Sequence, residues 1–141
     1  MRMLNGDQRR TLPASRRRVR YLVLAVGTIA VGVMVHLGGT FLPPVFRDVL
    51  GDALWAMMIV WWMGVAAPRL PLRTRGLAAL AVCVAVELSQ CYHTPFLDAL
   101  RRTLPGHLVL GSGYDPRDFL AYSAGVVLAI VLVRALAERD A

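Results

Sequence analysis

Residues 78–93 read AALAVCVAVELSQCYH, and nine apolar residues in this stretch lead directly to the carboxylate of Glu87. A charged group inside such a run costs about 3 kcal/mol on bilayer insertion scales, so it usually faces the protein interior, has a partner and is functional. Gln90 follows three residues later and therefore shares a helical face with Glu87. The stretch predicts a membrane helix whose inner face carries the main polar group of the protein.

The composition of the whole chain supports a membrane protein. The chain has 141 residues, of which 57% are hydrophobic, and its mean hydropathy is +0.54. Such a chain is too apolar for an ordinary soluble domain of this size. The apolar residues form four blocks of about 15–20 residues, which is close to the length of a membrane helix. We therefore expect an all-α membrane protein with a four-helix transmembrane bundle over residues 20–137, preceded by a disordered cytoplasmic tail over residues 1–19.

The connections between the blocks contain further helix signals. Membrane helices are expected over residues 21–37, 53–67 and 76–91, and a fourth from Pro116 through residue 133. Pro43 and Pro44 predict a short interfacial helix in the first connection, after which Asp52 is expected to cap the second membrane helix. Thr94 and Pro95 predict a second interfacial helix, and Asp115 is the expected cap of the fourth membrane helix. Short interfacial helices are thus expected in both long connections.

The arginines indicate the orientation of the chain in the membrane. The net charge is +7, and all sixteen basic residues are arginine. Seven arginines precede the first apolar block, three lie in residues 68–75 and two lie at the end, whereas the other two connections together hold four. Cytoplasmic loops carry the excess of arginine, so both termini are expected inside and the two long connections outside. Because the arginines follow topology, we do not expect nucleic-acid binding.

Several polar residues are expected to meet below the outer connections. Small residues at four-residue spacing in three of the helices predict close packing that leads toward these polar positions. An unpaired Glu87 would be costly, so a basic partner is expected, with Arg47 preferred over Arg101 and His36. A structural Glu–Arg pair, or simple helix caps at Asp52 and Asp115, would explain the same residues without a ligand. The expected cluster is Glu87, Gln90, Asp118, Tyr122, Arg47, Asp48, Asp52, His93, Arg101 and His36.

Recognised catalytic and metal motifs are absent from the sequence. A metal site could be drawn from Glu87, His93, Asp115 and Asp118, whose side chains can bind a metal ion. Neither an HExxH nor a CxxC pattern is present, however. There is also no nucleophile elbow and no phosphate-binding glycine loop. We therefore expect no metal and no cofactor.

A set of spaced motifs resembles a known family. In order, they are Phe41-Leu42-Pro43, Arg47-Asp48, Gly51-Asp52-x-Leu54-Trp55, Glu87-Leu88-Ser89-Gln90-x-Tyr92-His93, Arg101-Arg102-Thr103, Leu110-Gly111-x-Gly113-Tyr114 and Asp118-Phe119-Leu120-Ala121-Tyr122-x-x-Gly125. Together they resemble the small bacterial membrane proteins catalogued as domain of unknown function family 2809. The Glu-x-x-Gln helix followed by the Asp-x-x-x-Tyr-x-x-Gly helix is also similar to VanZ-like proteins. The first resemblance implies a four-helix protein of the bacterial inner membrane with no established activity, and the second implies a role in the cell envelope.

Several functions are compatible with these features. The first is a protein that binds an envelope lipid or a lipid-linked ligand in an outward-facing polar pocket, with Arg47, Arg101 and Arg102 available for phosphate. The second is an enzyme acting on such a lipid, with Glu87 or Asp118 as general acid or base. A small transporter or a structural membrane subunit is a further alternative. The sequence leaves open whether the protein is an enzyme, which ligand it takes and its oligomeric state.

The predicted topology has a direct test. Alkaline phosphatase is active only outside the cytoplasm, so its fusion after Arg75 should give an inactive reporter, and its fusion after Arg102 should give an active one. Reporter activity after Arg75 would contradict the assignment of both termini to the cytoplasm.

Overall fold

Prolines mark the starts of the helices in this chain. Proline lacks a backbone N–H, so it is tolerated in the first turn of a helix and disruptive in the interior. Pro13 precedes α1 (Ala14–Leu37), Pro44 opens α2 (Pro44–Ala66) and Pro71 precedes α3 (Leu72–Gln90). Two short helices, α4 (Pro95–Arg101) and α5 (Leu104–Leu110), lead to α6 (Asp118–Arg139). Pro95 is the first residue of α4, where the Thr94 hydroxyl accepts a hydrogen bond from the Leu97 N–H as predicted for the cap.

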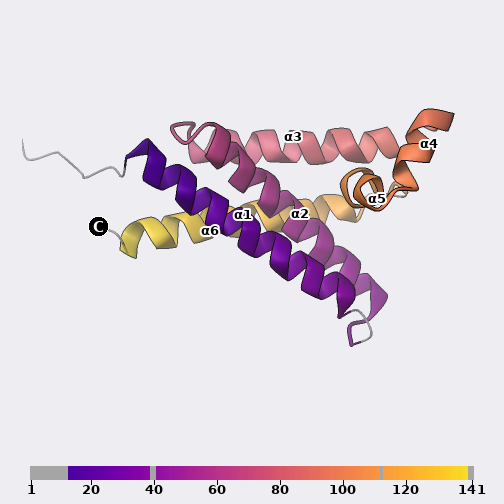
Figure 1. The fold of residues 1–141 in the computed structure, drawn as a ribbon, viewed down its shortest axis with the longest axis horizontal. Helices are drawn as coiled ribbons and strands as arrows, with labels where there is room; N and C mark the ends of the chain where they lie inside the picture. Colours follow the sequence, from indigo (N-terminus) through magenta and orange to yellow (C-terminus); the bar gives the residue numbers. More distant parts are fainter. Residues whose placement is uncertain (1–12, 39–40, 112, 140–141) are drawn as a thin grey trace, which may run out of the picture.

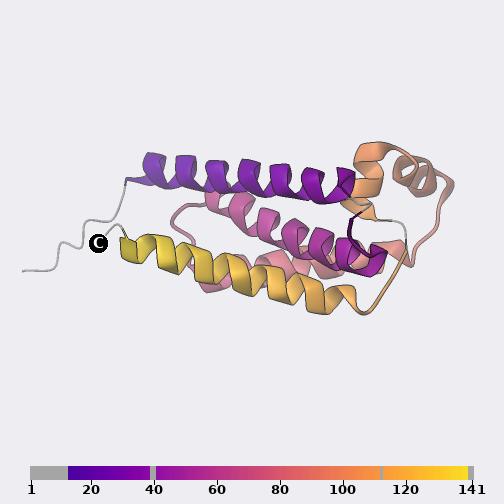
Figure 2. The same cartoon turned by 90° about the horizontal axis from the view of Figure 1, so that it is seen from below.

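The computed structural model describes residues 13–38, 41–111 and 113–139, except for the side chains of Leu104, His107, Leu108, Glu138 and Arg139. These residues form an all-α fold without a strand. Figure 1 shows the long helices α1, α2, α3 and α6, and Figure 2 shows that α4 and α5 lie at one end of them while the start of α1 and the end of α6 lie at the other.

Three of the helices are long and apolar enough to cross a membrane, namely α1, α2 and α6. The helices α3 and α4 pass the same test only as a pair, and they are bent by 116° at the break between them. The chain therefore has three membrane-spanning candidates, or four if the bent pair is one span. The sequence predicts four straight spans, whereas the structure has three and a bent pair, α3 and α4, in the place of the fourth.

The start of the chain and the first connection differ from the sequence-based expectations. Helix α1 begins at Ala14 rather than at residue 21, because the arginines that follow Pro13 are good helix formers and extend the apolar helix backward. Residues 1–12 of the expected tail lie outside the described residues. Helix α2 is continuous from Pro44, so the separate interfacial helix is wrong and Asp52 lies inside a helix instead of capping one. Gly51, next to Asp52, has a low helix propensity, but one glycine destabilises a helix by only about 1 kcal/mol.

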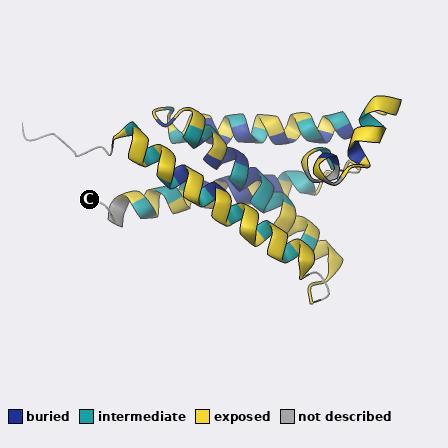
Figure 3. Ribbon diagram, in the orientation of Figure 1, coloured by how far each residue is buried: buried dark blue, intermediate teal, exposed yellow. Residues whose placement is uncertain are grey.

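Helix α2 lies at the centre of the packing and contacts α1, α3 and α6. Trp61 of α2 is fully buried, and its indole N–H donates a 3.0 Å hydrogen bond to the Thr28 hydroxyl of α1. Figure 3 shows burial concentrated where α2 passes between its neighbours, whereas most of α1 is exposed. The exposed residues of α1 are mainly apolar, among them Leu22, Val26 and Ile29. An apolar outer surface is what a helix surrounded by lipid requires.

The crossing of α2 and α6 depends on Gly125. A Cβ atom at this position would overlap the backbone carbonyl of Ala53, so only glycine allows the two helices to approach this closely. The neighbouring small residues Ala121 and Ala129 are also buried, as their four-residue spacing predicted. The crossing matters for the polar site because Ala53 adjoins Asp52, and Asp118 lies two turns before Gly125.

We predict that Gly125→Ala lowers the free energy of unfolding by about 1–3 kcal/mol, because the new methyl group must push α2 and α6 apart. Gly51→Ala is the matched control, since a Cβ there has no atom within 4 Å. The control should be neutral or stabilising, because alanine is favoured over glycine in a helix. Unfolding in mixed micelles measures both variants, and equal stability of the two would show that the crossing is not close.

Candidate functional site

The carboxylate of Glu87 is fully buried and is surrounded by hydrogen-bond donors. Its Oε1 accepts a 2.7 Å hydrogen bond from the backbone N–H of Asp115, in the turn before α6. Its Oε2 accepts from the Tyr122 hydroxyl of α6 at 3.1 Å and from the Gln90 side-chain amide at 3.3 Å. Hydrogen bonds from three donors stabilise a carboxylate that water cannot reach. Glu87 therefore ties α3 to α6 and to the turn that precedes α6.

The predicted ion pair between Glu87 and Arg47 is wrong. In the described part of the chain, no basic side chain lies within ion-pair distance of Glu87. Arg47 Nε instead lies 3.9 Å from Asp48 Oδ1 near the start of α2. The reason is the continuous helix α2, which holds Arg47 on an outer turn and prevents the segment from folding back over the bundle. The second and third choices, Arg101 and His36, do not pair with Glu87 either.

Gln90 and Gly111 close the site on the side of α5. Gln90 is buried on the same face of α3 as Glu87, as the spacing predicted, and Gly111 lies directly against its amide. Gly111 has a φ of +66°, in the left-handed region that favours glycine, and a Cβ there would overlap the Gln90 side chain. The Oε1 atom of Gln90 is buried without a hydrogen-bond partner. The connection to α6 thus passes over the end of α3 and excludes water from Glu87.

A pair of carboxyl groups lies next to this closed network. Asp52 of α2 and Asp118 of α6 are close enough to interact electrostatically, and both are only partly buried. The arrangement therefore offers several acceptor oxygens beside Glu87. Asp48, one turn before Asp52, is 69% exposed and lies outside the pair.

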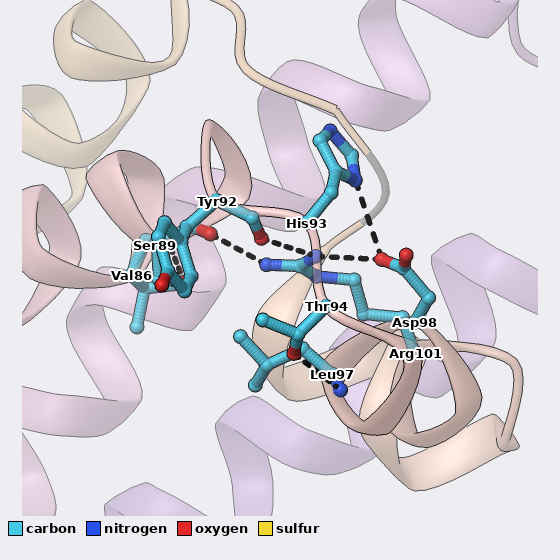
Figure 4. Close-up of polar contacts among 8 residues, drawn as sticks. All are labelled: Val86, Ser89, Tyr92, His93, Thr94, Leu97, Asp98 and Arg101. Carbon is cyan, nitrogen blue, oxygen red and sulfur yellow. Dashed lines mark hydrogen bonds and ion pairs between the residues drawn. The ribbon is translucent and has the colours of Figure 1, made fainter.

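Arg101 has a structural position instead of a place in the cluster (Figure 4). Its Nη2 donates a 2.6 Å hydrogen bond to the Ser89 carbonyl, and its Nη1 donates to the Tyr92 carbonyl and to Asp98 Oδ1. The first two acceptors lie at the carboxyl end of α3, where carbonyl groups lack partners within the helix. Arg101, which is 9% exposed, therefore holds α4 across the end of α3 and is not available for phosphate.

The two histidines expected in the cluster lie away from it. His93 Nδ1 is 3.2 Å from Asp98 Oδ1 on the exposed side of the same corner, as Figure 4 shows. His36 is exposed near the end of α1, a helix that packs against α2. The structure thus brings together Glu87, Gln90, Tyr122, Asp52 and Asp118, which we call the polar cluster. Arg47, Asp48, His93, Arg101 and His36 are not part of it.

Sequence reasoning missed the donor with the shortest hydrogen bond to Glu87. Asp115 was expected as a helix cap, and its Oδ1 does accept a 2.9 Å hydrogen bond from the Arg117 N–H, but its own backbone N–H binds Glu87. A backbone donor has no residue-type signal, so sequence alone cannot find it. Within the described residues, no three histidine, cysteine or acidic side chains are placed to hold a metal ion together.

We predict that Tyr122→Phe lowers the free energy of unfolding by about 1–3 kcal/mol, because it leaves a buried carboxylate with one donor fewer. Tyr114→Phe is the control, since Tyr114 is exposed. Combining Tyr122→Phe with Glu87→Gln should cost less than the sum of the two single changes, because both remove the same hydrogen bond. Strict additivity would show that the two residues do not interact.

Comparison with known proteins assigns this chain to a family. The model of the family described as "Protein of unknown function (DUF2809)" matches residues 41–126, which include every member of the polar cluster. No solved structure matches the chain. The match covers more than half of the sequence and runs from the connection before α2 into α6. The chain is therefore a member of the DUF2809 family.

Proposed function

We propose that this chain is an integral membrane protein that binds a cell-envelope lipid or lipid-linked ligand at the polar cluster. The carboxyl pair Asp52–Asp118 is the observation that carries the proposal. These two groups are partly exposed at an end of the helices, whereas Glu87 behind them is fully buried. Exposed acceptors supported by a closed hydrogen-bond network form a preorganised site, which lowers the cost of ordering on binding.

The chemistry of the cluster favours a ligand that donates hydrogen bonds. Its partly exposed side chains Asp52 and Asp118 supply carboxyl oxygens, which accept bonds from hydroxyl or ammonium groups. Two of the three arginines considered earlier for phosphate do not support phosphate recognition here. Arg101 is engaged by backbone carbonyls, and Arg47 lies beside Asp48. We therefore propose that the head group presents an ammonium or a hydroxyl group to the carboxyl pair.

The distribution of arginine supports the outward orientation of this site. The polar cluster lies at the end of the helices that is remote from the N-terminal arginines of α1. By the positive-inside rule, this end faces out of the cytoplasm, with both termini inside. The proposed location is the bacterial inner membrane, where such a site would meet the outer leaflet and the envelope. The distant similarity to VanZ-like proteins is consistent with this location.

An enzyme acting on an envelope lipid is the second candidate. A general acid or base must reach the proton that it transfers, and Glu87 is fully buried with both oxygens occupied. The Asp52–Asp118 pair is better placed, because the two carboxyl groups lie close together and remain partly exposed. If the protein is an enzyme, we expect Asp118 and Asp52 to be the acid–base groups, with Glu87 positioning Tyr122.

Two lipids that differ only in their donors test the binding proposal. Phosphatidylethanolamine has ammonium N–H groups, whereas phosphatidylcholine has the same phosphate and net charge without them. We predict that phosphatidylethanolamine raises the Tm of the purified protein more than phosphatidylcholine does. Asp118→Asn should reduce this difference, because it removes a charged acceptor.

Asp48→Asn is the matched control, since it removes a more exposed carboxylate one turn before Asp52 and leaves both members of the pair in place. It should retain the response of the wild type. Equal stabilisation by both lipids, or an unchanged response in Asp118→Asn, would contradict binding through the carboxyl pair. Mass spectrometry of the recovered lipid separates the two candidates, because a product lost in Asp118→Asn would indicate an enzyme.

A further inference from the structure

The charges of the described side chains are strongly segregated between the two ends of the molecule. All six described acidic residues lie at or near the end that carries the polar cluster. The opposite end, where α1 and α3 begin and α2 and α6 finish, carries no acid among the described side chains (Figure 2). It carries eight arginines: Arg16, Arg17, Arg18, Arg20, Arg69, Arg73, Arg75 and Arg134. This end therefore has a strongly positive potential that attracts anions.

A groove with a volume of about 350 Å³ lies within this arginine-rich end. It is formed between the first turns of α1 and the connection from α2 to α3. Its walls combine two arginines with four residues that have small or apolar side chains. The lining residues are Ala14, Arg18, Ala67, Pro68, Arg69 and Leu70.

Arg75 stabilises the wall of the groove from behind. Its Nη2 donates a 2.9 Å hydrogen bond to the Pro68 carbonyl, and its Nε donates a 3.0 Å bond to the Leu70 carbonyl. These carbonyls flank Arg69 in the sequence, so Arg75 holds the turn from which Arg69 projects. The guanidinium carbon also lies 4.7 Å from the centre of the Tyr21 ring, a cation–π distance.

Among the described side chains, no acidic group pairs with Arg75 inside this wall. Arg75 is only 3% exposed, and its Nη1 is buried without a hydrogen-bond partner. A buried cation is screened weakly by solvent and adds to the positive potential of the groove. The structure thus contains a fixed turn with one arginine behind it and two arginines along the groove itself.

The groove lies at the level expected for lipid head groups. The apolar part of α1 begins at Tyr21, one turn after Arg18, and α2 ends at Ala66, directly before the groove. Aromatic and arginine residues at such helix ends are typical of the membrane–water interface. A membrane lipid would therefore present its phosphate at this depth, next to the apolar side chains that form the rest of the lining.

We propose that this groove binds the phosphate of an anionic membrane lipid, with Arg18 and Arg69 donating hydrogen bonds to the phosphate oxygens. Arginine suits this role because its planar guanidinium can bind two oxygens at once. Arg75 is a positioning residue that fixes the turn of Arg69. The site lies at the opposite end from the polar cluster and does not depend on the function proposed there.

Lipid binding by the purified full chain in phosphatidylcholine nanodiscs tests this site. Native mass spectrometry would follow retention of phosphatidylglycerol as its proportion in the nanodisc is raised. The double variant Arg18→Gln, Arg69→Gln should weaken retention at least about tenfold, because it removes both charge-assisted contacts. The double variant Arg16→Gln, Arg73→Gln removes the same charge from the same end at exposed positions outside the groove, and it should change retention less than about twofold.

Three further outcomes decide the proposal. Equal losses in the two double variants would show a diffuse electrostatic attraction and overturn a specific site. Displacement of the lipid by an equal concentration of inorganic phosphate would show that the free ion is the ligand and would overturn lipid binding. Asp48→Asn, which removes an exposed carboxylate outside the polar cluster at the opposite end, should retain phosphatidylglycerol as the wild type does, so a loss there would show that retention does not depend on the groove.

Discussion

The buried carboxylate of Glu87 is the constraint on which the arrangement of this protein depends. A carboxylate that has lost its water must receive hydrogen bonds from the protein, because an unsatisfied charge in an apolar interior is strongly destabilising. Here the donors come from three places, the Gln90 amide, the Tyr122 hydroxyl and the Asp115 backbone N–H. The requirement brings α3, α6 and the turn before α6 into one fixed geometry. It also explains why Gly111 lies so close to Gln90.

Two arginines show how the same residue type takes different roles at the two ends of the bundle. Arg101 binds carbonyls at the end of α3 and holds α4 across it. Arg75 binds carbonyls in the connection before α3 and stabilises the groove between α1 and that connection. Both are buried, and both donate to backbone carbonyls, those bound by Arg101 at the end of α3 and those bound by Arg75 in the connection from α2. The consequence is that α3 is anchored at both ends by arginine, with Glu87 bound to α6 between them.

The separation of charge gives the molecule two chemically different ends. The acidic end presents the Asp52–Asp118 pair, which accepts hydrogen bonds, and the arginine-rich end presents donors. A membrane provides matching groups at both interfaces, because lipid head groups contain phosphate together with amines or hydroxyls. The proposed lipid site at the polar cluster and the proposed phosphate site at the groove therefore follow from one feature, a bundle whose ends differ in charge. The segment matched by the DUF2809 family model contains the whole polar cluster, whereas α1 lies before that segment.

The sequence by itself determined the class of the protein, the helix starts at Pro44 and Pro95, and the grouping of Glu87, Gln90 and Tyr122. These features are local, since proline positions, apolar runs and the spacing of polar residues on one face depend only on nearby residues. Only the tertiary structure decided that Arg47 remains on α2, that Arg101 caps α3 and that Asp52 meets Asp118. Each of these contacts depends on how whole helices pack, and the shortest bond to Glu87 comes from a backbone N–H, which every residue except proline carries. A sequence pattern can therefore identify a buried carboxylate, but the partner that satisfies it is chosen by the fold.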